Sequence, residues 1–511
     1  MSKYLLTPSD LRATICSAIP PEGAAELGPL LDLTRFFVPK SHSRALNLSV
    51  PIVVGDRGTG KSYWWTSLQM RSHREELAKE APDTRIRANT IVIPGFGNAA
   101  TIQDQLSLDF YPAPKLIDEL LDQFSAQSIW KTIIVWAVSR ETESGGEAPL
   151  PALESWQQKV KWLNDNTEAA ERLLQSKELE LVKADRDMLI VFDALDLITN
   201  DSRRLERIVE GLSQCALQLR SFRRLHAKVF LRSDQFDPQR IGRFADASKL
   251  KASSVRLHWL VTELYGMLWR LLANHPTEGT AYRQDVFTLL YAARNKDLLK
   301  GTGQEQAMLS LTQPEDWSLP SAAFFDPATQ ERLFHHLTGP YMGENARRGF
   351  PYRWLPTHLA DAHGAISPRS FQISIRAAAQ HTQETNPECT TAIGYKSLYA
   401  GVRQASDQRV REMAEAYAWI ELLMQPLADQ KLVPFDFAEV EDIWLDQGTL
   451  DHPELQRARL NNAEAAKQAL ISLGLIRPMS TGKYDIPDIY RLQFHLGRRG
   501  GIPLTNRTVG S

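Results

Sequence analysis

The amino-acid sequence predicts an α/β fold: a parallel sheet with helices between its strands, followed by helical regions and a small helix-plus-hairpin unit. Residues 50–54 (VPIVV) form a short, almost wholly apolar run that ends in a Gly-rich turn, as a buried parallel strand does. A helical pattern at 62–79 and a second apolar run at 89–94 complete a strand–helix–strand unit. Apolar runs at 188–192 and 227–231 repeat the alternation, which favours a parallel sheet.

The remaining elements follow from the same patterns. A weaker strand is expected at 254–257, after a helical pattern at 205–222. The stretch from about 105 to 187 is too long for one crossover and looks helical, so we interpret it as an insertion in the sheet order. Near the end of the chain, the helical pattern AKQALISLGL is followed by a Gly-containing hairpin, which suggests a winged helix.

These patterns divide the chain into parts. Strand signals fade after about residue 274, and helical patterns dominate from there. The expected parts are an N-terminal segment (1–45), a core that includes the insertion at about 105–187 (46–275), a helical lid region (276–400) and a helical and winged-helix-like C-terminal domain (401–511).

The composition is that of an ordinary folded protein. Of 511 residues, 43% are hydrophobic and 23% are charged, without disordered or collagenous character. A formal net charge of −2 creates no global field toward nucleic acid or a membrane. The three cysteines lack disulfide or zinc spacing, and no apolar run suits a signal peptide or a membrane span. We therefore expect a cytoplasmic protein that does not contact membranes.

The turn after the first strand carries the clearest chemical signal. Residues 55–62 (GDRGTGKS) fit the pattern G-x-x-x-x-G-K-[ST] at every fixed position, between a strand and a helix. Glycines let backbone N–H groups curl around a β-phosphate, and the helix N-terminus adds its dipole. Lys61 is expected to reach the β- and γ-oxygens, and Ser62 to bind magnesium. We expect ATP and Mg2+ here, held by Gly55, Asp56, Arg57, Gly58, Thr59, Gly60, Lys61 and Ser62.

A carboxylate for the metal is expected at the end of a neighbouring strand. Asp193 directly follows the apolar strand at 188–192, so we expect it to hold magnesium together with Ser62. Ala194 stands where many ATPases place a glutamate that polarises the attacking water. Asp196, three residues after Asp193, is the candidate catalytic base. The alternatives for Asp196 are a helix N-cap or a solvated acid in a turn.

Arginines follow the next strand. Arg232 comes directly after residues 227–231 and is expected at the sheet edge that holds the phosphates, where it could sense the γ-phosphate. The alternative is a surface arginine that pairs with Asp234. Arg240 and Arg243 lie in a helix or loop that could face a neighbouring subunit as an arginine finger, or could simply be solvated.

At these residues the chain resembles the AAA+ and STAND branch of P-loop ATPases, and within it bacterial stand-alone ATPases that share features with NACHT and archaeal Orc-like proteins. Residues 193–197 (DALDL) look like the D-G-L-D-E box of NACHT proteins, with Ala194 in place of glycine and Leu197 in place of the final glutamate. The resemblance covers roughly residues 35–400 as a pattern. The departure at Leu197 leaves Asp196 as the nearby candidate base.

The resemblance also implies roles outside the loop. Residues 364–371 (GAISPRSF) are similar to a G-x-P-R type segment of a helical lid, in which an arginine touches the nucleotide as a second sensor. Arg369 takes this role by resemblance, and the alternative is a surface arginine at a helix start, where Pro368 is typical. Residues 37–42 lie where relatives place a loop against adenine. Families of this type use ATP to change conformation or oligomeric state, and many bacterial members act in antiphage defence or as regulators.

Two stretches are candidate partner surfaces. Residues 201–260 carry thirteen Lys or Arg against six Asp or Glu, so they could meet nucleic acid or form a solvated or subunit-contact face. Residues 477–511 carry six basic residues against two acids beside the predicted wing. DNA docking and a packing role are both open there, because the fold alone does not assign DNA binding. A homo-oligomer or a protein partner is expected as well.

The sequence thus predicts a magnesium-dependent ATPase that works as a molecular switch. The alternative is a DNA-binding or scaffold protein that binds ATP with little turnover, which Ala194 favours. A nucleotide kinase is disfavoured, because residues 101–187 show no acceptor site.

Overall fold

The computed structural model describes residues 6–21, 32–98, 110–140, 150, 153–236, 250, 252–291, 319–429 and 432–504. The chain divides into two compact units, Glu26–His258 and Met1–Ala25 with Trp259–Ser511. We call the first the sheet unit and the second the helical unit. The predicted four-part division of the chain stays a prediction.

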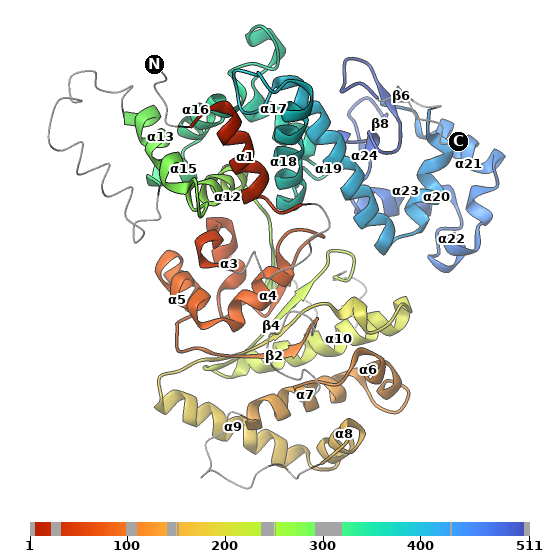
Figure 1. The fold of residues 1–511 in the computed structure, drawn as a ribbon. Coiled ribbons are helices and arrows are strands. Elements are labelled where there is room, and N and C mark those ends of the chain that lie inside the picture. The colour runs from red at the N-terminus through yellow and green to blue at the C-terminus, as the bar shows by residue number, and fades with distance from the viewer. Residues whose placement is uncertain are drawn as a thin grey trace, which may run out of the picture. The chain divides into compact units, whose positions relative to one another are not determined.

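The sheet unit is built on a parallel sheet, as predicted (Figure 1). Its strand order is β2-β3-β4-β1-β5, and all four strand pairs are parallel. The carboxyl ends of the strands therefore share one edge, with β4 between β1 and β3. The strands are β1 (Ile52–Val54), β2 (Ile91–Phe96), β3 (Met188–Phe192), β4 (Leu225–Leu231) and β5 (Ser254–Arg256).

Helices cover both faces of this sheet because strand side chains alternate between the faces. Ile52 and Val54 pack into one hydrophobic cluster, and Val53 packs into the cluster on the other face. Figure 1 shows α3, α4 and α5 on one face and α7 and α10 on the other. The helices of this unit are α3 (Ser43–Leu46), α4 (Lys61–Gln69), α5 (Arg71–Glu80), α6 (Pro114–Leu120), α7 (Ala126–Arg140), α8 (Trp156–Asp165), α9 (Thr167–Lys183) and α10 (Ser202–Gln218).

Two predictions about helices in the sheet unit have clear outcomes. The stretch expected to form a helical insertion does hold α6, α7, α8 and α9. The single helix expected at 62–79 is instead two helices, α4 and α5. Met70 separates them with an extended backbone, at φ −87° and ψ 123°.

The helical unit begins with α1 (Pro8–Ala18), which packs against α18 and α12 although the whole sheet unit separates them in sequence. Arg12, which is buried, donates from Nε to Gln383 Oε1 of α18 at 2.9 Å. The other helices of this unit that precede β6 are α12 (Val261–Ala273), α13 (Gly279–Tyr291), α15 (Ser321–Phe325), α16 (Pro327–Thr338), α17 (Pro351–Leu359), α18 (Pro368–Thr385), α19 (Tyr395–Ala416) and α20 (Trp419–Met424).

The C-terminal part has the predicted helix followed by a hairpin. Helix α23 leads into the antiparallel strands β7 and β8, and Phe435 forms a bridge to Tyr484 on the other side of β8. This is a winged-helix-like arrangement. The elements are β6 (Leu432–Val433), α21 (Phe437–Asp446), α22 (Pro453–Arg457), α23 (Ala463–Ser472), β7 (Arg477–Pro478), β8 (Tyr484–Asp485), α24 (Asp488–Arg491) and β9 (Gly497–Arg498).

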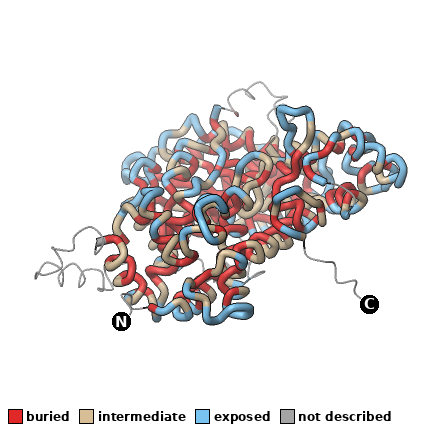
Figure 2. The backbone as a smooth tube through the Cα atoms, turned by 90° about the horizontal axis from the view of Figure 1, so that it is seen from above, coloured by how far each residue is buried: buried red, intermediate tan, exposed pale blue. Residues whose placement is uncertain are grey.

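The buried residues follow the strands and the inner faces of the helices, and Figure 2 marks them in red along the backbone. The interior strand β3 is buried at each of its five positions. Among the residues that the structure describes, no helix combines the length and the apolar character that crossing a membrane requires.

Candidate phosphate-binding site

The Gly-rich loop connects β1 to α4 at the carboxyl edge of the sheet. Gly58 and Gly60 have φ values of 77° and 100°, a left-handed backbone that residues with a Cβ rarely adopt. A Cβ on Gly55 would lie 2.6 Å from Thr59 Oγ1, so this position has no room for a side chain. The loop ends at the N-terminus of α4, whose first N–H groups have no carbonyl partner within the helix. This backbone suits an anion such as a phosphate.

Lys61 folds back onto its own loop. Its Nζ donates to the carbonyl oxygens of Gly55 and Asp56, each at 2.8 Å. Burial lowers the pKa of Lys61 to about 8, although the nearby carboxylate of Asp193 acts in the opposite direction. The ammonium group is therefore already desolvated at the place where the motif expects phosphate oxygens.

Asp193 lies where the sequence predicts it, directly after β3, and its residue is 4% exposed. Its carboxylate forms a hydrogen bond with the side chain of Ser62, at the start of α4. Burial raises the pKa of Asp193, and the hydrogen bond with Ser62 opposes that shift. A hydroxyl and a carboxylate oxygen, brought together from two elements, are the hard oxygen ligands that magnesium takes. The predicted pair thus fits a magnesium ion.

Asp196 lies in a short 3-10 helix, Leu195–Leu197, whose N-cap is Ala194. The alternative of a helix N-cap is therefore wrong for Asp196. Its Oδ2 accepts a hydrogen bond from Arg232 Nη1 at 3.1 Å and lies 4.0 Å from Arg57 Nη2. The candidate base is thus held by the candidate sensor and by an arginine of the Gly-rich loop.

Arg232 also forms the pair that the sequence offered as an alternative. Its Nη2 donates to Asp234 Oδ2 at 2.8 Å, and its Nε donates to Asp234 Oδ1 at 3.1 Å. Both the predicted place at the sheet edge and the pairing with Asp234 are observed. Arg256, at the end of β5, lies 3.8 Å from Asp56. The sequence analysis missed Arg256, because a charge at the end of a weak strand has no local signal.

The loop before the first strand is tied to the helix that follows the Gly-rich loop. Trp64 Nε1 donates to His42 Nδ1 at 3.0 Å, so Nε2 carries the proton of the neutral ring. His42 Nε2 lies 3.0 Å from the carbonyl oxygen of His258 and donates to it. Burial lowers the pKa of His42 to about 3. This histidine is therefore a neutral connector between residues 37–42, α4 and the end of the sheet.

The other predicted site residues belong to the helical unit or fall outside the described residues. Arg369 occupies the first turn of α18 in the helical unit, and its Nη1 donates to Glu412 Oε1 at 2.8 Å. Its role as a nucleotide sensor stays a prediction. Arg240 and Arg243 fall outside the described residues, so the arginine-finger prediction also stays open.

The basic stretch at 201–260 has many of its charges engaged within the sheet unit. Arg204 pairs with Asp118 at 2.6 Å and with Asp122 at 2.7 Å. Arg224 pairs with two carboxylates in the same way, Asp185 and Asp187. The arginines named here form a structural network, as a solvated or packing face would.

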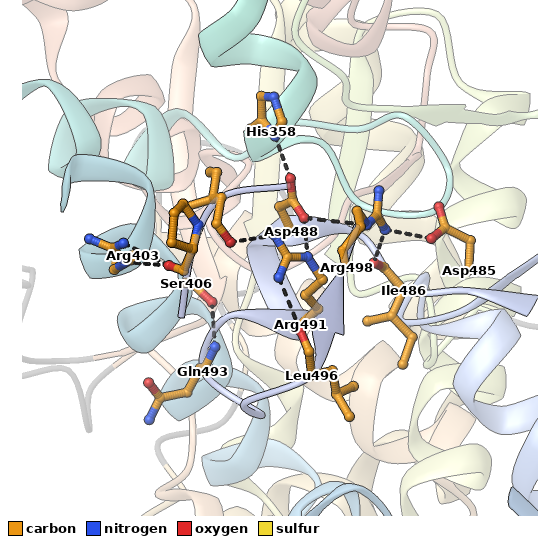
Figure 3. A network of polar contacts seen from close by, with 12 residues as sticks. His358, Arg403, Ser406, Asp485, Ile486, Asp488, Arg491, Gln493, Leu496 and Arg498 are labelled. Atoms are coloured by element: carbon orange, nitrogen blue, oxygen red, sulfur yellow. Dashed lines mark hydrogen bonds and ion pairs between the residues drawn. The ribbon is translucent and has the colours of Figure 1, made fainter. Parts of the chain in front are cut away.

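The basic residues near the predicted wing are engaged as well (Figure 3). Arg498 Nη2 donates to Asp485 Oδ1 at 2.5 Å, and Arg477 Nη2 donates to Asp485 Oδ2 at 2.7 Å. Arg491 is fully buried and donates to Asp488, which also contacts His358 of α17. These contacts tie the wing region to the preceding helices of the same unit.

The fold and the site together define a class. A parallel sheet with a Gly-rich loop between its strand β1 and the helix α4, and a carboxylate after the strand β3, is an α/β P-loop fold. No protein-family model matches the chain, and no curated protein sequence matches it either.

Solved structures of archaeal proteins align along most of the chain. The Aeropyrum pernix ORC2 protein, in ADPNP and ADP complexes, has 13% identity over 92% of both chains and a TM-score of 0.36. Cdc6p from Pyrobaculum aerophilum has 10% identity over 94% of both chains and a TM-score of 0.28. The Aeropyrum pernix ORC1 protein, in complex with DNA, has 14% identity over 95% of this chain and 94% of its own, with a TM-score of 0.30.

Proposed function

We propose that the protein binds ATP with magnesium at residues 55–62, hydrolyses it, and uses the cycle to switch conformation. One observation carries the proposal: the Gly-rich loop, the half-buried Lys61 and the pair formed by Ser62 and Asp193 lie together at one edge of the sheet. A left-handed loop at a helix N-terminus favours phosphate, and the oxygen pair beside it favours a divalent cation.

The chain's own residues divide the work. Lys61, whose ammonium group donates to the carbonyl oxygens of Gly55 and Asp56, would donate to the β- and γ-phosphate oxygens of a bound nucleotide. Ser62 and Asp193 would hold magnesium, which when bound neutralises charge on the phosphate oxygens. Asp196 would orient the attacking water once an arginine partner releases its carboxylate. Arg232, still paired with Asp234, would add positive charge near the γ-phosphate.

A second candidate function is ATP binding with little turnover in a DNA-binding or scaffold protein. Two observations favour it: Ala194 at the common position of the base, and Asp196 in ion pairs with Arg232 and Arg57. Phosphate release by the purified protein distinguishes the two functions. Turnover supports the ATPase, and stoichiometric ATP binding without phosphate release supports the scaffold.

The substitution Lys61→Ala tests the site itself. Turnover should disappear and ATP affinity should fall strongly, because this substitution removes the ammonium group that the motif directs to the β- and γ-oxygens. Lys79→Ala on α5 is the matched control, since the side chain of Lys79 is 72% exposed and pairs with Glu76. Undiminished turnover in Lys61→Ala would reject the assignment of the site.

ATP-dependent self-association is part of this proposal. It rests on Arg232 at the sheet edge and on Arg240 and Arg243 in the sequence that follows. Light scattering with a slowly hydrolysed ATP analogue should show a mass increase over the ADP state. A monomeric mass in every nucleotide state and at every protein concentration would favour a switch that acts within one chain.

The setting that the sequence resemblance implies is antiphage defence or regulation linked to nucleic acid. Plaque counts in host cells that carry wild-type or Lys61→Ala protein test the role in antiphage defence. Binding of a DNA duplex by the full chain tests the link to nucleic acid. Arg499, beside β9, is an exposed basic residue, and its substitution by alanine should weaken this binding.

A further inference from the structure

We infer that Arg57 also reaches the γ-phosphate within the same chain, and that Asp196 is its partner when no γ-phosphate is bound. This inference rests on the proposed ATP site and adds to it the residue that distinguishes ATP from ADP. Arg57 occupies a variable position of the Gly-rich loop, so the motif itself assigns it no role.

The geometry of Asp196 supports this inference. A single oxygen, Oδ2, faces two guanidinium groups: Arg232 Nη1 at 3.1 Å and Arg57 Nη2 at 4.0 Å. Asp196 also lies close enough to Asp193 to influence its pKa. Asp196 therefore lies close both to Arg57 of the Gly-rich loop and to the candidate metal ligand Asp193. Neither arginine is strongly exposed, at 27% for the side chain of Arg57 and 14% for that of Arg232.

The two arginines belong to different elements, and this decides which of them is the nearer to a bound phosphate. Arg232 donates to both oxygens of Asp234, so it stays paired if Asp196 is released. Arg57 lies in the loop that wraps the phosphates, so a small movement would exchange one anionic oxygen for another. A γ-phosphate carries more negative charge than a carboxylate and presents more acceptor oxygens, so it should win this competition.

The exchange has a consequence for chemistry. When Arg57 moves to the γ-phosphate, Asp196 loses one of its two cationic neighbours and becomes a better acceptor for a water proton. ADP offers no γ-phosphate, so Arg57 stays on Asp196. Asp196 then serves in place of the glutamate that many ATPases have at the position of Ala194, and it does so only when ATP is bound.

Equilibrium binding to the full chain tests the inference without relying on turnover. A non-hydrolysable ATP analogue and ADP are titrated into wild-type protein, Arg57→Ala, Arg57→Lys and Arg71→Ala, after thermal melting has shown that each variant folds. Arg57→Ala should weaken the analogue at least tenfold while ADP affinity changes less than twofold. Arg57→Lys should restore part of the preference. Arg71→Ala is the matched control, since it removes an exposed arginine of α5 that pairs with Glu75, and it should keep the wild-type preference.

The substitution Asp196→Asn should change the affinity for the ATP analogue in the opposite direction from Arg57→Ala. Removing the competing carboxylate should leave ADP affinity unchanged and tighten the ATP analogue about threefold or more. The inference would be overturned if Arg57→Ala weakened both nucleotides equally or weakened neither. In that case, nucleotide binding by the wild-type protein and loss of this binding in Lys61→Ala would still support the proposed function. Absence of any nucleotide binding by the wild-type protein would instead overturn both.

Discussion

Arg369 of α18 and Glu412 of α19 form an ion pair, with 2.8 Å between Nη1 and Oε1. The side chain of Glu412 is 7% exposed, whereas that of Arg369 is 50% exposed. Arg409, one turn before Glu412 on α19, approaches the other carboxylate oxygen at 3.8 Å. A buried carboxylate thus lies between two arginines, and it positions Arg369 at the beginning of its helix.

Arg369→Ala tests the sensor role. If Arg369 reaches the γ-phosphate, its loss removes one charge-assisted contact, which costs about 1.5 to 3 kcal/mol. ATP affinity should then fall by roughly one to two decades while ADP affinity stays nearly constant. Calorimetric titration of both nucleotides measures this difference. Arg353→Ala is a suitable control, because Arg353 is an exposed arginine of the same unit that pairs with Glu331. Equal weakening of ATP and ADP binding would mean that Arg369 does not contact the γ-phosphate and has only the structural role of its ion pair with Glu412.

Asp193→Ala should abolish magnesium-dependent hydrolysis, because it removes the carboxylate that pairs with Ser62. Asp196→Ala should retain nucleotide binding but slow the chemical step. Nucleotide affinity at several magnesium concentrations, measured beside phosphate release, separates the two roles. An equal loss of binding in both variants would remove Asp196 from the role of base.

His42 makes the stability of the protein depend on pH. Its pKa is lowered from 6.5 to about 3 by burial, so between these values the unfolded chain binds a proton that the folded chain does not. The contribution is fully present above about pH 6.5 and is lost as the pH falls toward 3. At about 1.4 kcal/mol per pKa unit, the loss at pH 4 is roughly 3 kcal/mol. Urea unfolding of wild-type protein and of His42→Gln across this range isolates the effect. Identical pH dependence in the two proteins would contradict it.

Arg491→Met should strongly destabilise the helical unit. Arg491 is fully buried and donates to Asp488 and to the carbonyl oxygens of Leu496 and Ile502, the latter two at 3.0 Å and 3.1 Å. Removing one partner of a buried ion pair costs about 3 to 5 kcal/mol. Arg403→Ala, which removes partly exposed hydrogen bonds to the carbonyl oxygen of Pro503, should cost about 1 kcal/mol. Equal midpoints of chemical unfolding for the two variants would contradict the prediction that Arg491→Met is the more destabilising.

The parts of the site that the sequence predicted are those encoded in contiguous residues. The spacing within 55–62 predicts a glycine loop whose backbone curls around a phosphate, and the structure has left-handed φ values there at Gly58 and Gly60. Asp193 could be predicted because five apolar residues precede it, and a carboxylate after a buried strand lies at the sheet edge. The sheet was predictable for the same reason, since its strands other than the weaker β5 contain local apolar runs.

Other features depend on residues far apart in the chain. Lys228 counts as one more charge in the basic stretch, yet it is fully buried, and burial lowers its pKa to about 7. Its Nζ donates to the carbonyl oxygens of Ala45, Asn47 and Val50 at 2.8, 3.0 and 2.8 Å. No local pattern indicates that these carbonyls need a donor from a strand about 180 residues away.

The sequence by itself determined the strands, the Gly-rich loop and the hairpin at the C-terminal end, because backbone geometry and apolar periodicity act over a few neighbouring residues. Only the tertiary structure decided the pairing of charges: Asp196 with Arg57 and Arg232, and Arg369 with Glu412. An ion pair needs two groups within about 4 Å, and that separation is set by how strands and helices pack. The sequence could therefore name the charged residues of the site, while the structure determined which of them neutralise one another.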